Sequence, residues 1–280
     1  MLNTTDHARD AAGRVYVYPV LSRRAGGVSL GINLNVNRAC NWRCIYCQVP
    51  DLRRGGPPPV DLARLEGELD AMLTELLEGD YLLRHAPEGM RRLCDIALSG
   101  DGEPTTAAEF TAVVARLGAL LDRHGLRDRL PCRLITNGSQ MHRKRIQEGV
   151  RALAGIGGEV WFKLDRATSD GMRRINDSRE SPDGHFRRLA TCARLCPTWV
   201  QTCLFALDGK PPDATEQNAY LDLMRRAVRE DIGLKGIMLY GLARPSMQAE
   251  APRLSALPFE WMDAFAGRLR ALGLGVSVHR

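Results

Sequence analysis

The stretch Cys40-Asn41-Trp42-Arg43-Cys44-Ile45-Tyr46-Cys47 places three cysteines in a C-x3-C-x2-C spacing, with a tyrosine directly before the last one. Cysteine thiolates hold iron–sulfur clusters, and a four-iron cluster normally takes four protein ligands. This stretch supplies three, and no histidine or aspartate within it offers a fourth. One iron would therefore stay open to a group that is not protein, which favours a catalytic cluster over a structural one.

Other kinds of cysteine site fit the sequence less well. A structural zinc site usually has four ligands in two pairs, but the chain has no second C-x2-C pair and no H-x3-H pair. A ferredoxin would show a C-x2-C-x2-C-x3-C-P run, which is absent. A disulfide framework is not expected in 280 residues without a signal-peptide pattern. A zinc-binding or redox-sensing protein remains the alternative of a different class.

The three cysteines with Tyr46 resemble the signature of the radical S-adenosylmethionine (SAM) superfamily. The resemblance implies a [4Fe-4S] cluster on Cys40, Cys44 and Cys47, with SAM on the open iron. It implies an electron donor of flavodoxin or ferredoxin type, because the reduced cluster cleaves SAM to methionine and a 5′-deoxyadenosyl radical. It also implies a partial (β/α)6 barrel in which the cluster loop follows the first strand.

Strand and helix patterns alternate along the chain. Strands are expected over residues 15–20, 28–36, 95–99, 132–136, 159–165, 199–207, 236–241 and 275–279. Helices are expected over residues 61–77, 107–124, 143–154, 185–196, 216–230 and 259–272. This order predicts an α/β fold with parallel strands. We expect a partial TIM-type barrel over 28–245, an N-terminal extension over 1–27 and a C-terminal helix and strand over 246–280.

Several polar motifs follow predicted strands, where the reactive groups of parallel barrels collect. The run Gly100-Asp101-Gly102-Glu103-Pro104 resembles the GGEP motif that holds the SAM amino group, with an aspartate in place of one glycine. The resemblance makes Gly100, Asp101, Gly102 and Glu103 candidate SAM-binding residues, as it does Tyr46. Asn137 and Ser139 are candidates for the ribose or carboxylate of SAM, although Asn-Gly is also an ordinary turn.

Three further candidates for cofactor binding, Lys163, Asp165 and Arg244, carry charge. Lys163 and Asp165 lie two residues apart on a strand and therefore point to one face. A lysine in an apolar run is costly unless it is paired or used, so Lys163 is a candidate for carboxylate binding or amine catalysis, and a plain Lys163–Asp165 ion pair is the alternative. Arg244 could bind a carboxylate or phosphate through its guanidinium fork, with a surface ion pair as the alternative. Cys192, Cys196 and Cys203 are expected in the core.

The composition limits the partners and the localisation that we expect. The 31.0 kDa chain has a net charge of +6, which permits an RNA partner, but its basic residues are almost all arginine, with four lysines. The chain has no run of 18 apolar residues, so no membrane span is predicted. The N-terminus lacks a signal-peptide pattern. We therefore expect a cytoplasmic protein without membrane contact.

The motifs together look most like the branch that contains the tRNA wyosine-base synthases, from about Gly31 to Pro245. That branch condenses pyruvate with a tRNA base through a Schiff-base lysine and a second cluster on N-terminal cysteines. This chain has no cysteine before Cys40. The resemblance thus concerns the radical chemistry more than the substrate, and tRNA modification is the alternative function.

Overall fold

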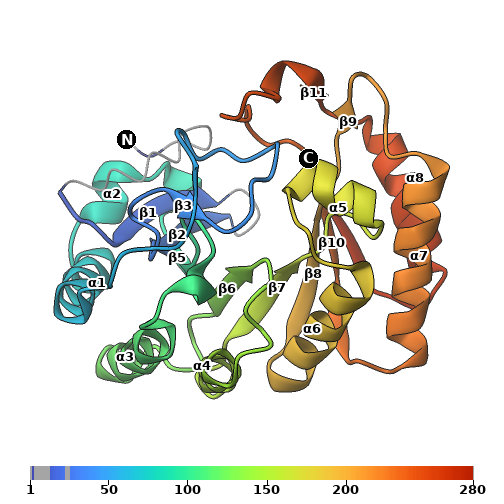
Figure 1. Cartoon of the computed structure of the whole chain (residues 1–280). Coiled ribbons are helices and arrows are strands. Elements are labelled where there is room, and N and C mark those ends of the chain that lie inside the picture. Colours follow the sequence, from blue (N-terminus) through green and yellow to red (C-terminus); the bar gives the residue numbers. More distant parts are fainter. Residues whose placement is uncertain (1, 3–12, 23–25, 280) are drawn as a thin grey trace. The chain divides into compact units, whose positions relative to one another are not determined.

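A computed structural model describes residues 2, 13–22 and 26–279 (Figure 1). The chain divides into two compact units, each made of three segments. The first unit comprises Met1–Asn41, Gly55–Ile135 and Arg143–Glu159. The second unit comprises Trp42–Arg54, Thr136–His142 and Val160–Arg280. The cysteine stretch is therefore divided by sequence, with Cys40 in the first unit and Cys44 and Cys47 in the second.

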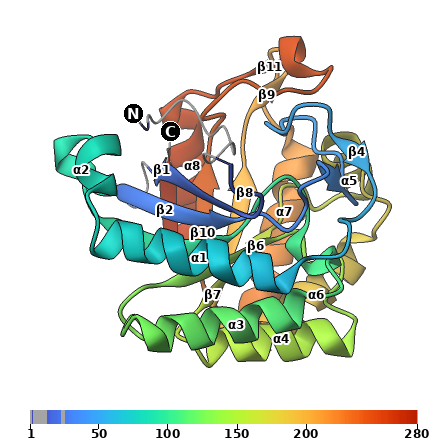
Figure 2. The ribbon, with the colours of Figure 1, turned by 90° about the vertical axis from the view of Figure 1, so that its left-hand side faces the viewer.

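The first unit is built on paired strands and the helices that follow them. Its strands are β1 (Val17–Ser22), β2 (Gly27–Ile32), β3 (Ala39–Cys40), β5 (Leu93–Leu98) and β6 (Cys132–Thr136), whose last residue belongs to the second unit. Its helices are α1 (Leu62–Leu77), α2 (Tyr81–His85), α3 (Phe110–Arg123) and α4 (Lys144–Ala154). β1 pairs antiparallel with β2, whereas β2, β5 and β6 are parallel. α1, α3 and α4 lie beside one another on one side of these strands (Figure 2).

Helix α1 shows why the sequence folds as it does here. Asp61 is its N-cap, and the Asp61 carboxylate accepts a hydrogen bond from the Arg64 N–H at 3.0 Å, which satisfies a donor that the helix itself cannot. Leu65, Leu69 and Leu73 lie on one face at helical spacing and are all fully buried.

The second unit continues the alternation of strand and helix. Its strands are β4 (Arg53–Arg54), β7 (Glu159–Lys163), whose first residue belongs to the first unit, β8 (Thr198–Cys203), β9 (Ala206–Leu207), β10 (Leu234–Tyr240), β11 (Leu254–Ser255) and β12 (Val276–His279). Its helices are α5 (Ser169–Asn176), α6 (Pro182–Leu195), α7 (Ala214–Arg229) and α8 (Phe259–Arg270). β7, β8, β10 and β12 are parallel, and α7 lies beside α8 (Figure 1).

The predicted fold class is confirmed. Six parallel strands in the described part, β2, β5, β6, β7, β8 and β10, are each followed by a helix, and β1 and β12 stand at the ends of a mostly parallel sheet of eight strands that does not close. This is a partial TIM-type barrel of the (β/α)6 kind. The division into extensions at 27 and 245 stays a prediction, and residues 1, 3–12 and 23–25 of the N-terminal extension lie outside the described residues.

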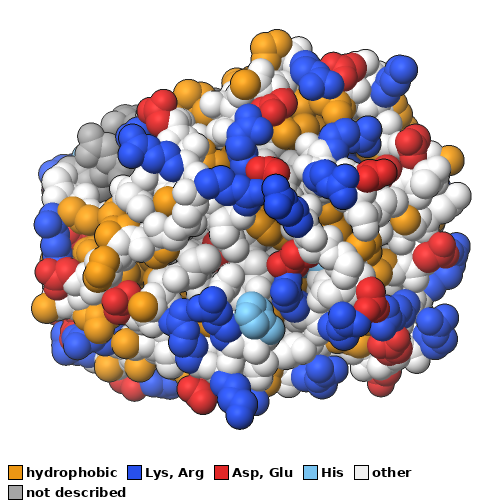
Figure 3. Space-filling view, in the orientation of Figure 1, with side chains coloured by type: hydrophobic (Ala, Val, Ile, Leu, Met, Phe, Trp, Pro, Cys, Tyr) orange, Lys and Arg blue, Asp and Glu red, His pale blue; other side chains and the backbone are white. Residues whose placement is uncertain are grey.

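Two findings concern surfaces. Among the described residues, no helix is both long enough and apolar enough to cross a membrane. Both basic and acidic side chains lie on the face drawn in Figure 3. Many charged side chains of the described residues form ion pairs, for example Arg84 with Asp80 at 2.7 Å.

Candidate functional site

The second unit fixes the backbone of the loop that carries Cys44 and Cys47. The last carbonyls of α5 accept hydrogen bonds from this loop: Asn176 O from the Arg43 N–H at 3.1 Å, and Ile175 O from the Ile45 N–H at 2.9 Å. The carbonyls at a helix C-terminus lack partners within the helix, so α5 and the loop satisfy each other. The loop is thereby held in one position from its first residues.

The segment after β10 holds the other side of the same loop. The Ser246 hydroxyl donates to Ile45 O at 2.8 Å, and the Met247 N–H donates to Cys47 O at 2.9 Å. Arg244, a predicted site residue, donates to Gln48 Oε1 at 3.4 Å. The structure thus brings Arg244 to the cysteine loop.

Cys44 has a specific polar neighbour. The Asn176 amide donates to Cys44 Sγ at 3.3 Å. Burial raises the pKa of the Cys44 thiol to about 12, while the charge of Lys163 acts in the opposite direction. A metal ion deprotonates a coordinating thiol outright, and the neighbouring N–H and ammonium would compensate the thiolate charge.

Asp165 is the centre of a buried hydrogen-bond network beside this loop. Its side chain accepts from the Tyr46 hydroxyl, from Asn176 Nδ2 at 2.7 Å and from the Cys203 backbone N–H at 2.9 Å. Lys163 Nζ lies 3.9 Å from Asp165 Oδ2. Three of the predicted site residues, Tyr46, Lys163 and Asp165, are therefore in mutual contact.

Lys163 sits in an aromatic and acidic surrounding. Its ammonium donates to the Tyr240 hydroxyl at 3.0 Å and lies 5.0 Å from the centre of the Tyr46 ring. Burial opposes its charge, but Asp165 and Tyr240 outweigh that effect and hold the pKa of Lys163 well above its ordinary value. The geometry favours a charged ammonium, stabilised by an ion pair and a cation–π contact.

The first unit holds the glycine-rich motif. Asp101 accepts from Asn33 Nδ2 at 2.7 Å, and its own N–H donates to Asn33 Oδ1 at 3.0 Å. Glu103, 2% exposed, accepts from the Thr105 N–H at 3.1 Å and begins a 3-10 turn. A Cβ on Gly100 would lie 2.2 Å from Asn33 Oδ1, and one on Gly102 would lie 2.2 Å from the Ala39 carbonyl.

Packing within the protein therefore explains why glycine stands at both positions, because a side chain there would collide with Asn33 or with the Ala39 carbonyl. Asn35 donates to Ala39 O at 2.9 Å, and its buried Oδ1 has no hydrogen-bond partner within the described residues. A buried acceptor without a donor is costly. An ammonium such as the amino group of SAM would fit this acceptor, which lies five residues before Cys40 in the sequence.

The run Thr136-Asn137-Gly138-Ser139 forms a turn in the second unit. Asn137 Oδ1 accepts from the Ser139 N–H at 3.0 Å, and both residues are buried. Gly138 has a φ of +70° and lies against the Phe162 ring, so only glycine fits there. The turn is therefore well defined.

Among the described residues, no three His, Cys, Asp or Glu side chains already surround a common point. None of the eight cysteines, all of which lie in the described part of the chain, forms a disulfide. Cys40, Cys44 and Cys47 are half-buried, and Cys192, Cys196 and Cys203 are buried in the core as predicted. The donors of the loop fit an iron–sulfur cluster, because the loop carries three thiols at the C-x3-C-x2-C spacing and because Cys44 has an N–H donor and an ammonium that would balance a thiolate.

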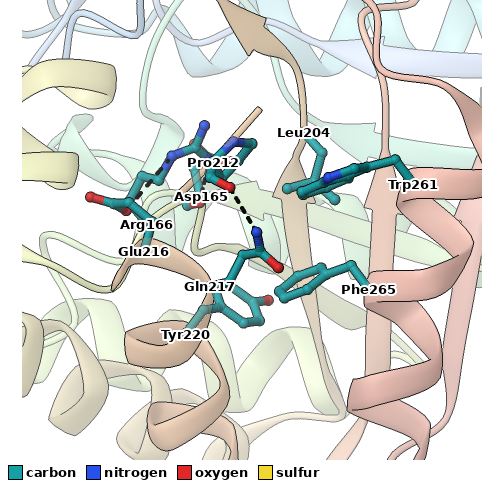
Figure 4. Close-up of a pocket in the computed structure, with 9 residues that line it drawn as sticks. All are labelled: Asp165, Arg166, Leu204, Pro212, Glu216, Gln217, Tyr220, Trp261 and Phe265. Atoms are coloured by element: carbon teal, nitrogen blue, oxygen red, sulfur yellow. Dashed lines mark hydrogen bonds and ion pairs between the residues drawn. The ribbon is translucent and has the colours of Figure 1, made fainter. Parts of the chain in front are cut away.

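A small cavity in the second unit is lined in part by Asp165 (Figure 4). Arg166 donates to Asp165 O at 2.6 Å, and its Nε lies 3.9 Å from Glu216 Oε2. The space is about the size of one water molecule. It is lined by Asp165, Arg166, Leu204, Pro212, Glu216, Gln217, Tyr220, Trp261 and Phe265. It is too small to take a substrate.

Sequence reasoning missed three polar residues of these sites. Asn33 and Asn35 lie within the predicted strand that ends before the cysteines. Their alternation with the apolar residues of that strand was a signal that could have identified them. Asn176 belongs to α5, a helix of eight residues that was not predicted. The signal for α5 was its N-cap Thr168 with Asp170 in the first turn.

No family model matches the chain. Over 165 residues the chain is 28% identical to a curated protein described as GTPase Obg from Brachyspira hyodysenteriae (strain ATCC 49526 / WA1), a match that covers 59% of this chain and 21% of that protein. The chain therefore spans about a fifth of the length of the curated relative that it matches. The chain contains no G-x4-G-K-[ST] phosphate-binding run. We therefore infer no activity from this match.

Solved structures resemble the chain over most of its length. One is a radical SAM methyltransferase from Sphaerobacter thermophilus, with a TM-score of 0.62 and 17% identity, over 94% of this chain and 69% of that one. Another is TYW1 with a lysine-pyruvate adduct bound, with a TM-score of 0.58 and 16% identity, over 87% and 73%. At these identities the likeness concerns the fold. The chain has the fold of the radical SAM proteins, as the cysteine stretch predicted.

Proposed function

We propose that the chain is a radical SAM enzyme whose Cys40, Cys44 and Cys47 hold a [4Fe-4S] cluster. When bound, the cluster supplies the electron that cleaves SAM to methionine and a 5′-deoxyadenosyl radical, which removes a hydrogen atom from the substrate. The observation that carries the proposal is the cysteine loop itself: three thiols at C-x3-C-x2-C spacing, on a backbone fixed by α5 and by residues 246–247. A structural zinc site would need a fourth protein ligand.

The chain's own residues hold and balance the charge of this loop. Tyr46 donates to Asp165, and Asn176 joins Asp165 to Cys44. The Lys163 ammonium supplies positive charge that would balance a thiolate at Cys44. We assign Lys163 and Asp165 to this task in preference to covalent catalysis.

We propose further residues for SAM. Asn35 Oδ1 and the motif Gly100, Asp101, Gly102 and Glu103 are our candidates for the amino group, because a buried acceptor there lacks a donor. Asn137 and Ser139 are candidates for the ribose, and Arg244 for a carboxylate. A reducing donor of flavodoxin or ferredoxin type would supply the electron.

Anaerobic reconstitution tests the proposal. We expect about four irons per chain and reductive cleavage of SAM to 5′-deoxyadenosine, both lost in Cys44→Ala. Cys94→Ala is the matched control, because Cys94 is a half-buried cysteine outside the loop, and it should retain both. Protein purified anaerobically with one zinc and no iron would instead identify the metal-binding or redox-sensing alternative.

A wyosine-type tRNA-modifying enzyme is the second candidate, favoured by the structural likeness to TYW1 with its lysine-pyruvate adduct. It predicts tRNA binding that weakens steeply with salt and a Lys163 adduct after treatment with pyruvate and cyanoborohydride. A neutral amine is required for imine formation, and the ion pair with Asp165 keeps Lys163 charged. We therefore expect no adduct in the wild-type protein, and a trapped adduct at Lys163 would favour this second function.

A further inference from the structure

Asn176 joins the cysteine loop to the Asp165 network. It is the last residue of α5 and only 1% exposed. Its side-chain nitrogen lies 3.3 Å from Cys44 Sγ and 2.7 Å from Asp165 Oδ2. Its backbone carbonyl accepts from the Arg43 N–H. One residue thus contacts the loop through both its backbone and its side chain.

The orientation of this amide is determined by its neighbours. An ionised carboxylate only accepts hydrogen bonds, so the side-chain atom facing Asp165 must be the NH2 group. That group has two protons, and the second acceptor within reach is the Cys44 sulfur. Asp165 is itself fixed by Tyr46 and by the Cys203 N–H, so the amide cannot easily turn away.

We propose that Asn176 is a positioning residue that raises the reduction potential of the cluster through an N–H···S hydrogen bond to Cys44. The inference rests on the proposed function, because it needs a cluster on Cys44. Hydrogen bonds to cluster sulfurs are among the factors that set the potential. A reduced cluster carries more negative charge on its sulfurs, and a hydrogen bond strengthens as its acceptor becomes more negative. The bond therefore stabilises the reduced form more than the oxidised form.

Removal of the donor should lower the potential. We expect Asn176→Leu, which keeps the branching and the number of side-chain heavy atoms but has no N–H, to shift the ratio of reduced to oxidised cluster at a given potential by roughly tenfold, which is 59 mV for a one-electron couple. Asn176→Ala also lacks the donor and serves as a second variant if leucine does not fit. Asn176→Gln keeps an amide donor, so its reduction potential should lie closer to that of the wild type than the potentials of the donor-free variants.

The measurement is a redox titration followed by electron paramagnetic resonance of the reduced cluster in reconstituted protein without SAM. The potential is read from the loaded fraction, so partial loading does not alter it. The control is Thr202→Val, which removes buried hydrogen bonds to Leu164 O and Tyr220 in the same unit without touching the cysteine loop. A lower potential in the Leu and Ala variants, with the control unchanged, supports the inference.

Two other results would overturn it, and they differ. If wild type and both donor-free variants titrate at the same potential, Asn176 does not tune the cluster, although the proposed function stands. If the wild-type protein takes up no iron, the proposed function fails and the inference fails with it.

Discussion

Replacement of Asp165 by alanine should strongly destabilise the second unit. The Asp165 side chain is fully buried and 3.9 Å from the Lys163 ammonium. Its removal leaves that ammonium with the Tyr240 hydroxyl as its hydrogen-bond acceptor. It also leaves Tyr46 and Asn176 each without the acceptor that Asp165 provides.

The size of the effect follows from these contacts. Removing one member of a buried ion pair costs about 3–5 kcal/mol, because the partner charge stays buried, and each buried donor left unsatisfied adds about 1–3 kcal/mol. Water entering the space offsets part of this. We therefore expect a loss of about 4 kcal/mol in the free energy of unfolding, which is a large share of the ~5–15 kcal/mol typical of native proteins.

Urea unfolding of the metal-free protein, followed by circular dichroism, measures this loss. The double variant Lys163→Met with Asp165→Asn removes both charges, and it should be less destabilised than the sum of the single variants by about 1–3 kcal/mol. Asp222→Ala on α7 is the control, because its ion pair with Arg225 is exposed and should matter by less than ~1 kcal/mol. An Asp165→Ala loss no larger than that of the control would refute the reasoning.

Two further predictions concern the first unit. Gly102→Ala should destabilise this unit by about 1–3 kcal/mol, because the new Cβ would lie 2.2 Å from a backbone carbonyl. Gly67→Ala in α1 should instead stabilise the unit by about 0.5–1 kcal/mol, because nothing lies within 4 Å of a Cβ there. Equal effects of the two variants on the urea midpoint would contradict the described packing. Burial raises the pKa of Glu68, but hydrogen bonds from two backbone N–H groups outweigh it and the pKa is lowered; its stabilisation should be present at neutral pH and lost as the pH falls through the lowered value, so Glu68→Gln should flatten the acid limb of stability against pH.

The fold was predictable because its signals are local. Period-2 strands and amphipathic helices such as α1 follow from spacing alone, and residues 132–136 formed a strand with the predicted bounds. The short helix α5 was missed because its eight residues include one glycine and three charged side chains, which leaves little apolar periodicity. The consequence is functional, since α5 carries Asn176.

The candidate site was predictable only in part. The cysteine spacing and the Lys163–Asp165 pair are both visible in sequence, because they depend on neighbours a few residues apart. The contacts of Asp165 with Tyr46 and Cys203, 119 and 38 residues away, depend on the tertiary fold and have no local signature. Packing against Asn33 and the Ala39 carbonyl also requires glycine at the two motif positions. The spacing of the sequence does not predict this requirement.

The most direct test of the central claim is the electron paramagnetic resonance spectrum of the reconstituted, chemically reduced protein before and after the addition of SAM. A cluster held by Cys40, Cys44 and Cys47 leaves one iron open, and SAM binding there should change the g-values of the signal. Cys40→Ala, Cys44→Ala and Cys47→Ala should each abolish the signal, while Cys94→Ala should preserve both the signal and its change. A cluster signal that SAM leaves unaltered, or one that survives loss of a loop cysteine, would contradict the account.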